Sequence, residues 1–197
     1  MADRANHDTD YAARLERIEG RTGDDSDWLS VVAAQLGQAP LPGQARSIAA
    51  KVLGQAEPTR LEPRASAEPE KLGLILLALC GIAPFFANVL ARHPELLMDL
   101  LDDDLETPRT AGYLHDALDK ALAAPGKSDP SERLRVFKYR ELARITVRDC
   151  SGVWVPLSHS EVTLRELSDL ADVLLDRALS LAEAGVQRQL TPPTYRD

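Results

Sequence analysis

Charged residues fall among the apolar positions of one predicted helix, and this pattern constrains the fold more than any other feature of the chain. Residues 134–149 place Leu134 and Phe137 on one broad side of a helix with a period of 3.6 residues. Glu141 and Arg148 fall on that same side. Because an isolated buried ion is very costly, we expect these charges either to be paired or to lead to solvent.

Three arginines form a ridge along this helix. Arg140, Arg144 and Arg148 follow one another at steps of four residues, and Glu141 lies three residues before Arg144. We expect Glu141 to be held by Arg144, by Arg148 or by an arginine of a neighbouring helix such as Arg165. Two interpretations of Arg140, Glu141, Arg144 and Arg148 stay open: structural ion pairing, or a surface that faces a nucleotide cleft or a partner protein.

A second helix follows after a short segment rich in glycine, proline and serine. Its apolar residues share one arc of the helical wheel: Leu164, Leu167, Leu170, Ala171, Leu174, Leu175, Ala178, Leu181 and Ala182. Its acidic residues lie outside that arc: Glu166, Asp169, Asp172 and Asp176. The sequence Ser158-His159-Ser160-Glu161 resembles a capping box at the start of this helix.

Composition favours an all-α fold. The chain has 197 residues, enough for one domain with a real core, and only 5% of them are aromatic. Few segments alternate with a period of two, so we expect six to nine helices and no sheet that could hold an active site. The core residues we expect are Leu72–Leu79, Phe86, Val89, Leu142, Ile145, Leu167, Leu170 and Leu174.

Charge and cysteine usage exclude several classes of partner. The net charge of −8 argues against nucleic-acid binding, because neutralising phosphates needs a basic surface. The most apolar run, Leu72–Leu79, is interrupted by Gly81 and Pro84 well short of the ~20 residues of a membrane span. Cys80 and Cys150 come without a signal peptide, so we expect reduced thiols and a cytoplasmic location.

The organisation we predict has three parts. Residues 1–68 form an acidic N-terminal segment with short helices and a Pro/Ala/Glu-rich link, and residues 56–69 read as an extended connector or a loop. Residues 69–185 form the helical domain. Residues 186–197 form a flexible tail.

The two C-terminal helices also resemble a known family. Residues 134–149, LRVFKYRELARITVRD, resemble the pattern LRxFRxREhhRIAxRD, with h apolar, of glutamine synthetase adenylyltransferases. The matching residues are Leu134, Arg135, Phe137, Lys138, Arg140, Glu141, Leu142, Arg144, Ile145, Arg148 and Asp149. In the next helix, which resembles the family's TxxELSxLAD segment, they are Thr163, Glu166, Leu167, Ser168, Leu170, Ala171 and Asp172. FFANVLARHPELL at Phe85–Leu97 resembles a third segment, and together the three cover roughly residues 73–182.

This resemblance implies the N-terminal helical portion of a bifunctional enzyme that regulates nitrogen assimilation by transferring AMP to and from glutamine synthetase. In that family Mg²⁺ and ATP are held by a GGxELNxxSDxDL-type segment downstream of the TxxELSxLAD helix, and this chain does not contain it. We therefore expect no catalytic residue, cofactor or metal in this chain, as a truncated piece or as a short homologue. The expected partner is the remainder of an adenylyltransferase polypeptide or glutamine synthetase. The alternative is a non-catalytic helical module that binds glutamine synthetase or a regulatory protein.

Motifs that would indicate other chemistry are missing. The sequence has no phosphate-binding glycine loop, no HExxH, no nucleophile elbow and no paired-cysteine zinc pattern. Residues 23–27, GDDSD, superficially resemble a nucleotidyltransferase metal motif, but the helical pattern after them favours a helix cap at Ser26 or Asp27. The acidic run Asp102–Asp104 is better explained as a solvated helix end than as a metal cluster.

Overall fold

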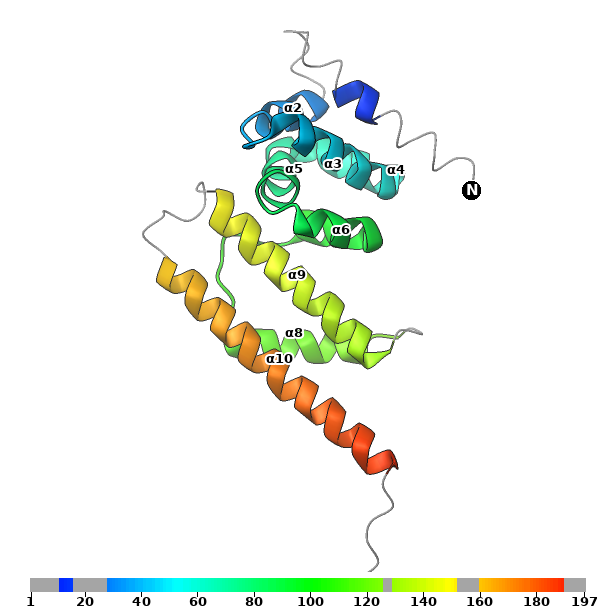
Figure 1. Cartoon of the computed structure of the whole chain (residues 1–197), viewed down its shortest axis with the longest axis vertical. Coiled ribbons are helices and arrows are strands. Elements are labelled where there is room, and N and C mark those ends of the chain that lie inside the picture. The colour runs from blue at the N-terminus through cyan, green and yellow to red at the C-terminus, as the bar shows by residue number, and fades with distance from the viewer. Residues whose placement is uncertain (1–10, 16–27, 126–128, 152–159, 190–197) are drawn as a thin grey trace, which may run out of the picture. The chain divides into compact units, whose positions relative to one another are not determined.

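Helices account for all the regular structure in the part of the chain that the structure describes (Figure 1). The structure is a computed structural model, and it describes residues 11–15, 28–125, 129–151 and 160–189. The elements are α2 (Trp28–Leu36), α3 (Pro42–Gln55), α4 (Pro58–Ala67), α5 (Pro69–Leu76), the π-helical turn η1 (Leu77–Ile82), α6 (Phe85–Arg92), α7 (Glu95–Asp102), α8 (Ala111–Ala123), α9 (Pro130–Ser151) and α10 (Ser160–Gln189). Residues 11–15 are also helical. The prediction of an all-α fold is confirmed.

Prolines set the start of most of these helices. Pro42, Pro58 and Pro69 occupy the first turn of α3, α4 and α5, where the missing N–H has no partner to lose. Pro84 and Pro94 directly precede α6 and α7, as the sequence predicts. A proline at these positions has its φ angle already in the helical range, so the local sequence alone fixes where these elements begin.

The Pro/Ala/Glu-rich stretch is helical, so the prediction of an extended connector or loop for residues 56–69 is wrong. Helix α4 contains Pro63, which removes one backbone hydrogen bond from its interior. The helix nevertheless forms because Leu61 and Ala65, four residues apart, are both fully buried. Arg64 also pairs with Asp102 of α7, at 2.7 Å from Nε to Oδ1 and 2.9 Å from Nη2 to Oδ2. Tertiary packing therefore overrides a sequence with no helical period.

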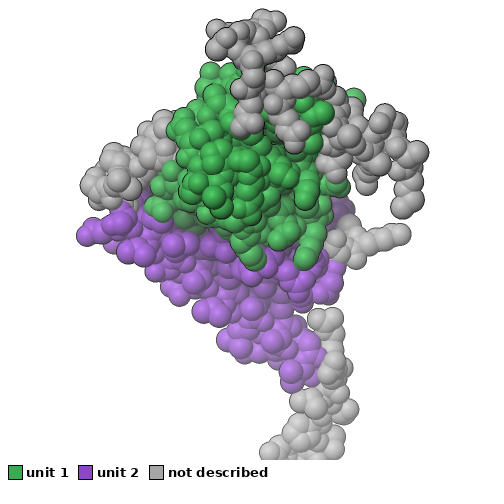
Figure 2. Space-filling view, turned by 45° about the horizontal axis from the view of Figure 1, so that its top comes forward, with its two compact units in different colours: residues 1–107, 143–157 green, residues 108–142, 158–197 purple. Residues whose placement is uncertain are grey.

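The described residues divide into two compact units, coloured separately in Figure 2. Unit 1 comprises residues 1–107 and 143–157, and unit 2 comprises residues 108–142 and 158–197. Helix α9 contributes residues to both units. Helix α5 packs against α2 within unit 1, so residues on both sides of the predicted boundary at residue 68 share one core. Much of the predicted tail, residues 190–197, lies outside the described residues.

The core of unit 1 depends on a close approach between α2 and α5. Leu72, Leu76 and Leu79 are fully buried, which confirms most of the predicted apolar cluster. Gly73 lies at the contact with α2, where a Cβ atom would come within 2.8 Å of Gln35 Cγ and 3.1 Å of Gln35 Cβ. The absence of a side chain at this position lets the two helices pack this closely.

Replacing Gly73 with alanine is therefore expected to destabilise unit 1 by about 1–3 kcal/mol, the usual cost of overpacking. The matched control is Gly112→Ala in α8, where an added Cβ meets no atom within 4 Å. That change should be neutral or stabilising by up to about 1 kcal/mol, because alanine favours helix more than glycine does. Urea melts of the two variants measure both effects, and a stabilised Gly73→Ala protein would contradict the close packing described here.

Unit 2 consists of α8, the first part of α9, and α10. Its buried apolar residues include Leu114, Leu118, Phe137, Leu170 and Val173. The predicted burial of Leu170 is confirmed, whereas three other predicted core residues are only half-buried: Leu142, Leu167 and Leu174. Helix α10 packs against α8, and Arg177 of α10 forms an ion pair with Asp119 of α8.

None of the described helices combines the length and the apolar character that crossing a bilayer would require.

Candidate functional site

The described part of the chain buries six polar or charged residues, and five of them belong to the two family-like motifs. They are Arg109, Glu141, Arg144, Arg148, Thr163 and Glu166. Glu141, Arg144 and Arg148 have no exposed surface at all, as the helical wheel predicts for Glu141 and Arg148. Arg140, the fourth residue of the predicted ridge, is half-buried. Their predicted role toward a partner or a cleft stays a prediction, but three of the four offer no surface in this structure.

In unit 2 the centre of this set is Arg109. Its guanidinium Nη1 donates to both carboxylate oxygens of Glu141, at 2.5 Å and 2.6 Å. Its backbone N–H donates to Glu166 Oε1 of α10 at 2.8 Å. One residue between α7 and α8 thus connects α9 to α10, and charge-assisted hydrogen bonds of this kind are about twice as strong as neutral ones.

Local sequence places Arg109 for this role. The side chain of Thr110, the next residue, accepts a hydrogen bond from Tyr113 N and caps the start of α8. The cap fixes the direction in which Arg109 leaves the helix. The Arg109 guanidinium also lies over the Tyr113 ring, with Cζ 4.8 Å from the ring centroid, which adds a cation–π contact. The Arg109–Glu141–Glu166 cluster is therefore built from a loop and two helices.

Sequence reasoning missed Arg109. We expected Glu141 to be held by Arg144, Arg148 or Arg165, whereas the structure shows Arg109, 32 residues away along the chain, on both of its oxygens. The available signal was indirect: Glu141 falls on a buried side, and Arg109 directly precedes a Thr cap. Neither observation by itself selects this arginine.

In unit 1 the end of α9 meets the loop after α7. Arg144 Nη1 donates to the carbonyl oxygen of Thr107 at 3.3 Å. Asp104 accepts from the backbone N–H groups of Glu106 and Thr107, at 2.9 Å and 3.2 Å. The side-chain hydrogen bond from Thr107, these backbone bonds and the charge of Arg144 all lower the pKa of Asp104. The loop is therefore held in one conformation by groups that prefer the ionised carboxylate.

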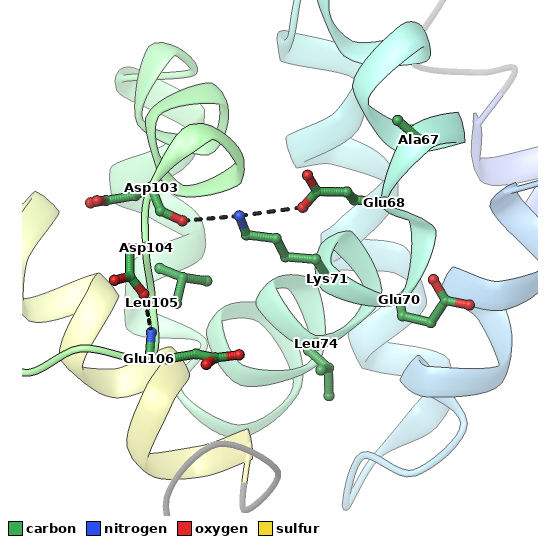
Figure 3. A pocket seen from close by; sticks show the side chains of 9 residues that line it. All are labelled: Ala67, Glu68, Glu70, Lys71, Leu74, Asp103, Asp104, Leu105 and Glu106. Carbon is green, nitrogen blue, oxygen red and sulfur yellow. Dashed lines mark hydrogen bonds and ion pairs between the residues drawn. The ribbon is translucent and has the colours of Figure 1, made fainter.

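The same loop borders a hollow of about 480 Å³ on unit 1, shown in Figure 3. Its charged lining residues are Glu68, Glu70, Lys71, Asp103, Asp104 and Glu106. The Lys71 ammonium is already engaged: it donates to the carbonyl oxygens of Leu101 and Asp103, at 2.5 Å and 2.9 Å, and pairs with Glu68. A hollow with five carboxylates and one committed lysine repels phosphate, so it does not suit ATP.

A metal site does not emerge among the described residues. No group of three His, Cys, Asp or Glu side chains within them is arranged to hold a metal ion. Within the acidic run, Asp102 is paired with Arg64, and this hydrogen bond lowers its pKa. The GDDSD segment at residues 23–27 lies outside the described residues.

The two cysteines are free thiols without the features of a nucleophile. Cys80 is buried in η1, and burial raises its pKa to about 12. Cys150 is half-buried, and burial followed by the charge of Asp149 raises its pKa as well. Because the thiolate is the reactive form, both thiols are unreactive at neutral pH.

Comparison with known proteins points to one family. A model of the glutamate-ammonia ligase adenylyltransferase family matches residues 74–197. The bifunctional glutamine synthetase adenylyltransferase/adenylyl-removing enzyme of Thioalkalivibrio sulfidiphilus (strain HL-EbGR7) is 32% identical over 122 residues, which is 60% of this chain and 12% of that enzyme. No solved structure matched the chain. Since the family match takes in α6 to α10 and the whole cluster, the chain belongs to the glutamate-ammonia ligase adenylyltransferase family.

Proposed function

We propose that this chain is a helical scaffold portion of a glutamine synthetase adenylyltransferase/adenylyl-removing enzyme, and that it is catalytically inactive by itself. In this proposal it acts in the cytoplasm, in the regulation of nitrogen assimilation by AMP transfer to and from glutamine synthetase. The observation that carries it is the burial of the family-like motif residues. Their charges hold helices together and are not presented to a substrate.

The chemistry of the buried carboxylates supports the inactive part of this proposal. Adenylyl transfer needs carboxylates free to hold Mg²⁺ and the phosphates of ATP. Both oxygens of Glu141 and one oxygen of Glu166 instead accept hydrogen bonds from Arg109. The acidic hollow of unit 1 is open, but its negative lining opposes a triphosphate. The described residues therefore do not fit Mg²⁺–ATP, and we derive no catalytic step from them.

The purified 197-residue chain is expected to leave glutamine synthetase unmodified. The measurement is transfer of label from ATP labelled in the α-phosphate, with Mg²⁺ present, and the release of AMP from adenylylated synthetase in a parallel reaction. A full-length bifunctional relative serves as the positive control on the same synthetase. Stoichiometric AMP transfer or removal by this chain alone would overturn the proposal.

The proposed partner is the remainder of an adenylyltransferase polypeptide or glutamine synthetase itself. The alternative, a module that binds the synthetase or a regulatory protein through the arginine ridge, loses support because Arg144 and Arg148 have no exposed surface. Titration calorimetry with glutamine synthetase and with the complementary portion of a full-length relative separates the two. Binding of the synthetase that is abolished by Arg140→Ala, with unfolding unchanged, would favour the interaction module.

A further inference from the structure

Helix α10 carries an apolar stripe that the rest of the described chain does not cover. Its exposed large apolar residues are Leu164, Leu175, Leu179 and Val186, with exposed fractions of 62%, 69%, 60% and 53%. Successive members are 11, 4 and 7 residues apart, which corresponds to about three, one and two helical turns. They therefore lie on one face. The buried residues Thr163, Glu166, Leu170 and Val173 lie on another.

The second half of α10 has little other support. No residue from Ala178 to Gln187 is buried, and Gly185 lies among them. Isolated helices shorter than about 12–15 residues are marginal in water, and an interior glycine costs about 1 kcal/mol relative to alanine. An additional surface against the exposed face would stabilise this part of the helix.

The order of residues along the stripe is symmetric about Leu175. Leu164 and Val186 lie 11 residues to either side of it, Ser168 and Ala182 lie 7 residues away, and Ala171 and Leu179 lie 4 residues away. An antiparallel copy of the same helix would thus place Leu175 against itself. It would also place Ala171 against Leu179, a small side chain opposite a large one, on both sides of the two-fold axis.

We propose that α10 pairs with α10 of a second copy of this chain in an antiparallel, two-fold symmetric dimer centred on Leu175. The same surface on both copies is what a two-fold interface requires. Between Leu164 and Val186 the stripe runs about 33 Å at 1.5 Å per residue, so four large apolar side chains from each copy leave water together. Alternating small and large residues let two helices approach closely.

Charge on one border of the stripe fits the same arrangement. Arg165 lies opposite Glu183 of the second copy, and the symmetry produces this pair twice. Asp172 and Asp176, next along that border, oppose each other with like charge. The dimer is therefore specified by the apolar register and by Arg165, and not by net charge.

Oligomeric mass gives the first test. Sedimentation equilibrium should show twice the 21.5 kDa mass of one chain, and Leu175→Glu should return the protein to the mass of one chain. Leu41→Glu, at an equally exposed leucine of unit 1, is the matched control and should remain dimeric. A wild-type chain that is monomeric from micromolar to millimolar concentration would overturn the proposal, and so would a dimer indifferent to Leu175→Glu.

Disulfide formation tests the register, in a Cys150→Ser background that keeps the buried Cys80. Leu175→Cys should form a covalent dimer on mild oxidation, because the two copies meet at the axis. Leu164→Cys alone should not, since its two copies would lie about 33 Å apart, beyond the ~7 Å limit between Cα atoms for a disulfide. Mixing Leu164→Cys with Val186→Cys should restore the cross-link. Cross-linking of Leu164→Cys to itself would exclude the antiparallel arrangement.

Discussion

Replacing Glu141 with alanine is expected to destabilise unit 2 by about 3–5 kcal/mol, the scale for removing one partner of a buried ion pair. The Arg109 guanidinium donates to both oxygens of this carboxylate and is only 8% exposed. Without Glu141 the cation loses its counter-charge in a place that water barely reaches. The measurement is the free energy of unfolding from urea melts followed by circular dichroism.

Two further variants separate the pair from a general effect of mutation. Asp116→Ala removes an exposed carboxylate of α8 in the same unit and should change stability by no more than about 0.5 kcal/mol. The double variant Arg109→Met/Glu141→Met removes both charges and should lose less stability than the sum of its two single variants, since buried pairs often tolerate replacement by apolar residues. Strict additivity would show that the two residues do not interact.

Truncating Leu79 to alanine is expected to cost unit 1 about 2–5 kcal/mol, the range for deleting a well-packed leucine side chain. Leu79 is fully buried in η1, the turn that continues α5 and packs against α3 and α6. The loss combines the transfer of apolar atoms and the cavity left behind, because the surrounding helices can collapse only partly.

Leu41→Ala is the matched control for this second change. Leu41 also belongs to unit 1, but it is 63% exposed, so truncating it should shift the free energy of unfolding by less than about 0.5 kcal/mol. Equal losses at Leu79 and Leu41 would contradict the core described for unit 1.

The sequence by itself determined that this chain is helical and where several helices begin. Prolines at the first turn and a threonine cap act within a few residues, so they operate whatever the rest of the chain does. The helical wheel also placed Glu141 and Arg148 on a buried side, and the structure confirms this. These properties are local, and local patterns are what a single sequence expresses.

Tertiary structure alone decided which groups meet. Arg109 reaches Glu141 from 32 residues away, whereas helical spacing reveals only pairs three or four residues apart. Helix α4 forms against its own composition because burial of Leu61 and Ala65 outweighs an interior proline. In α10 the sequence defined one apolar arc, but packing covers Leu170 and leaves Leu175 exposed. The reason is the same in each case: propensity is set by neighbours along the chain, and burial is set by neighbours in space.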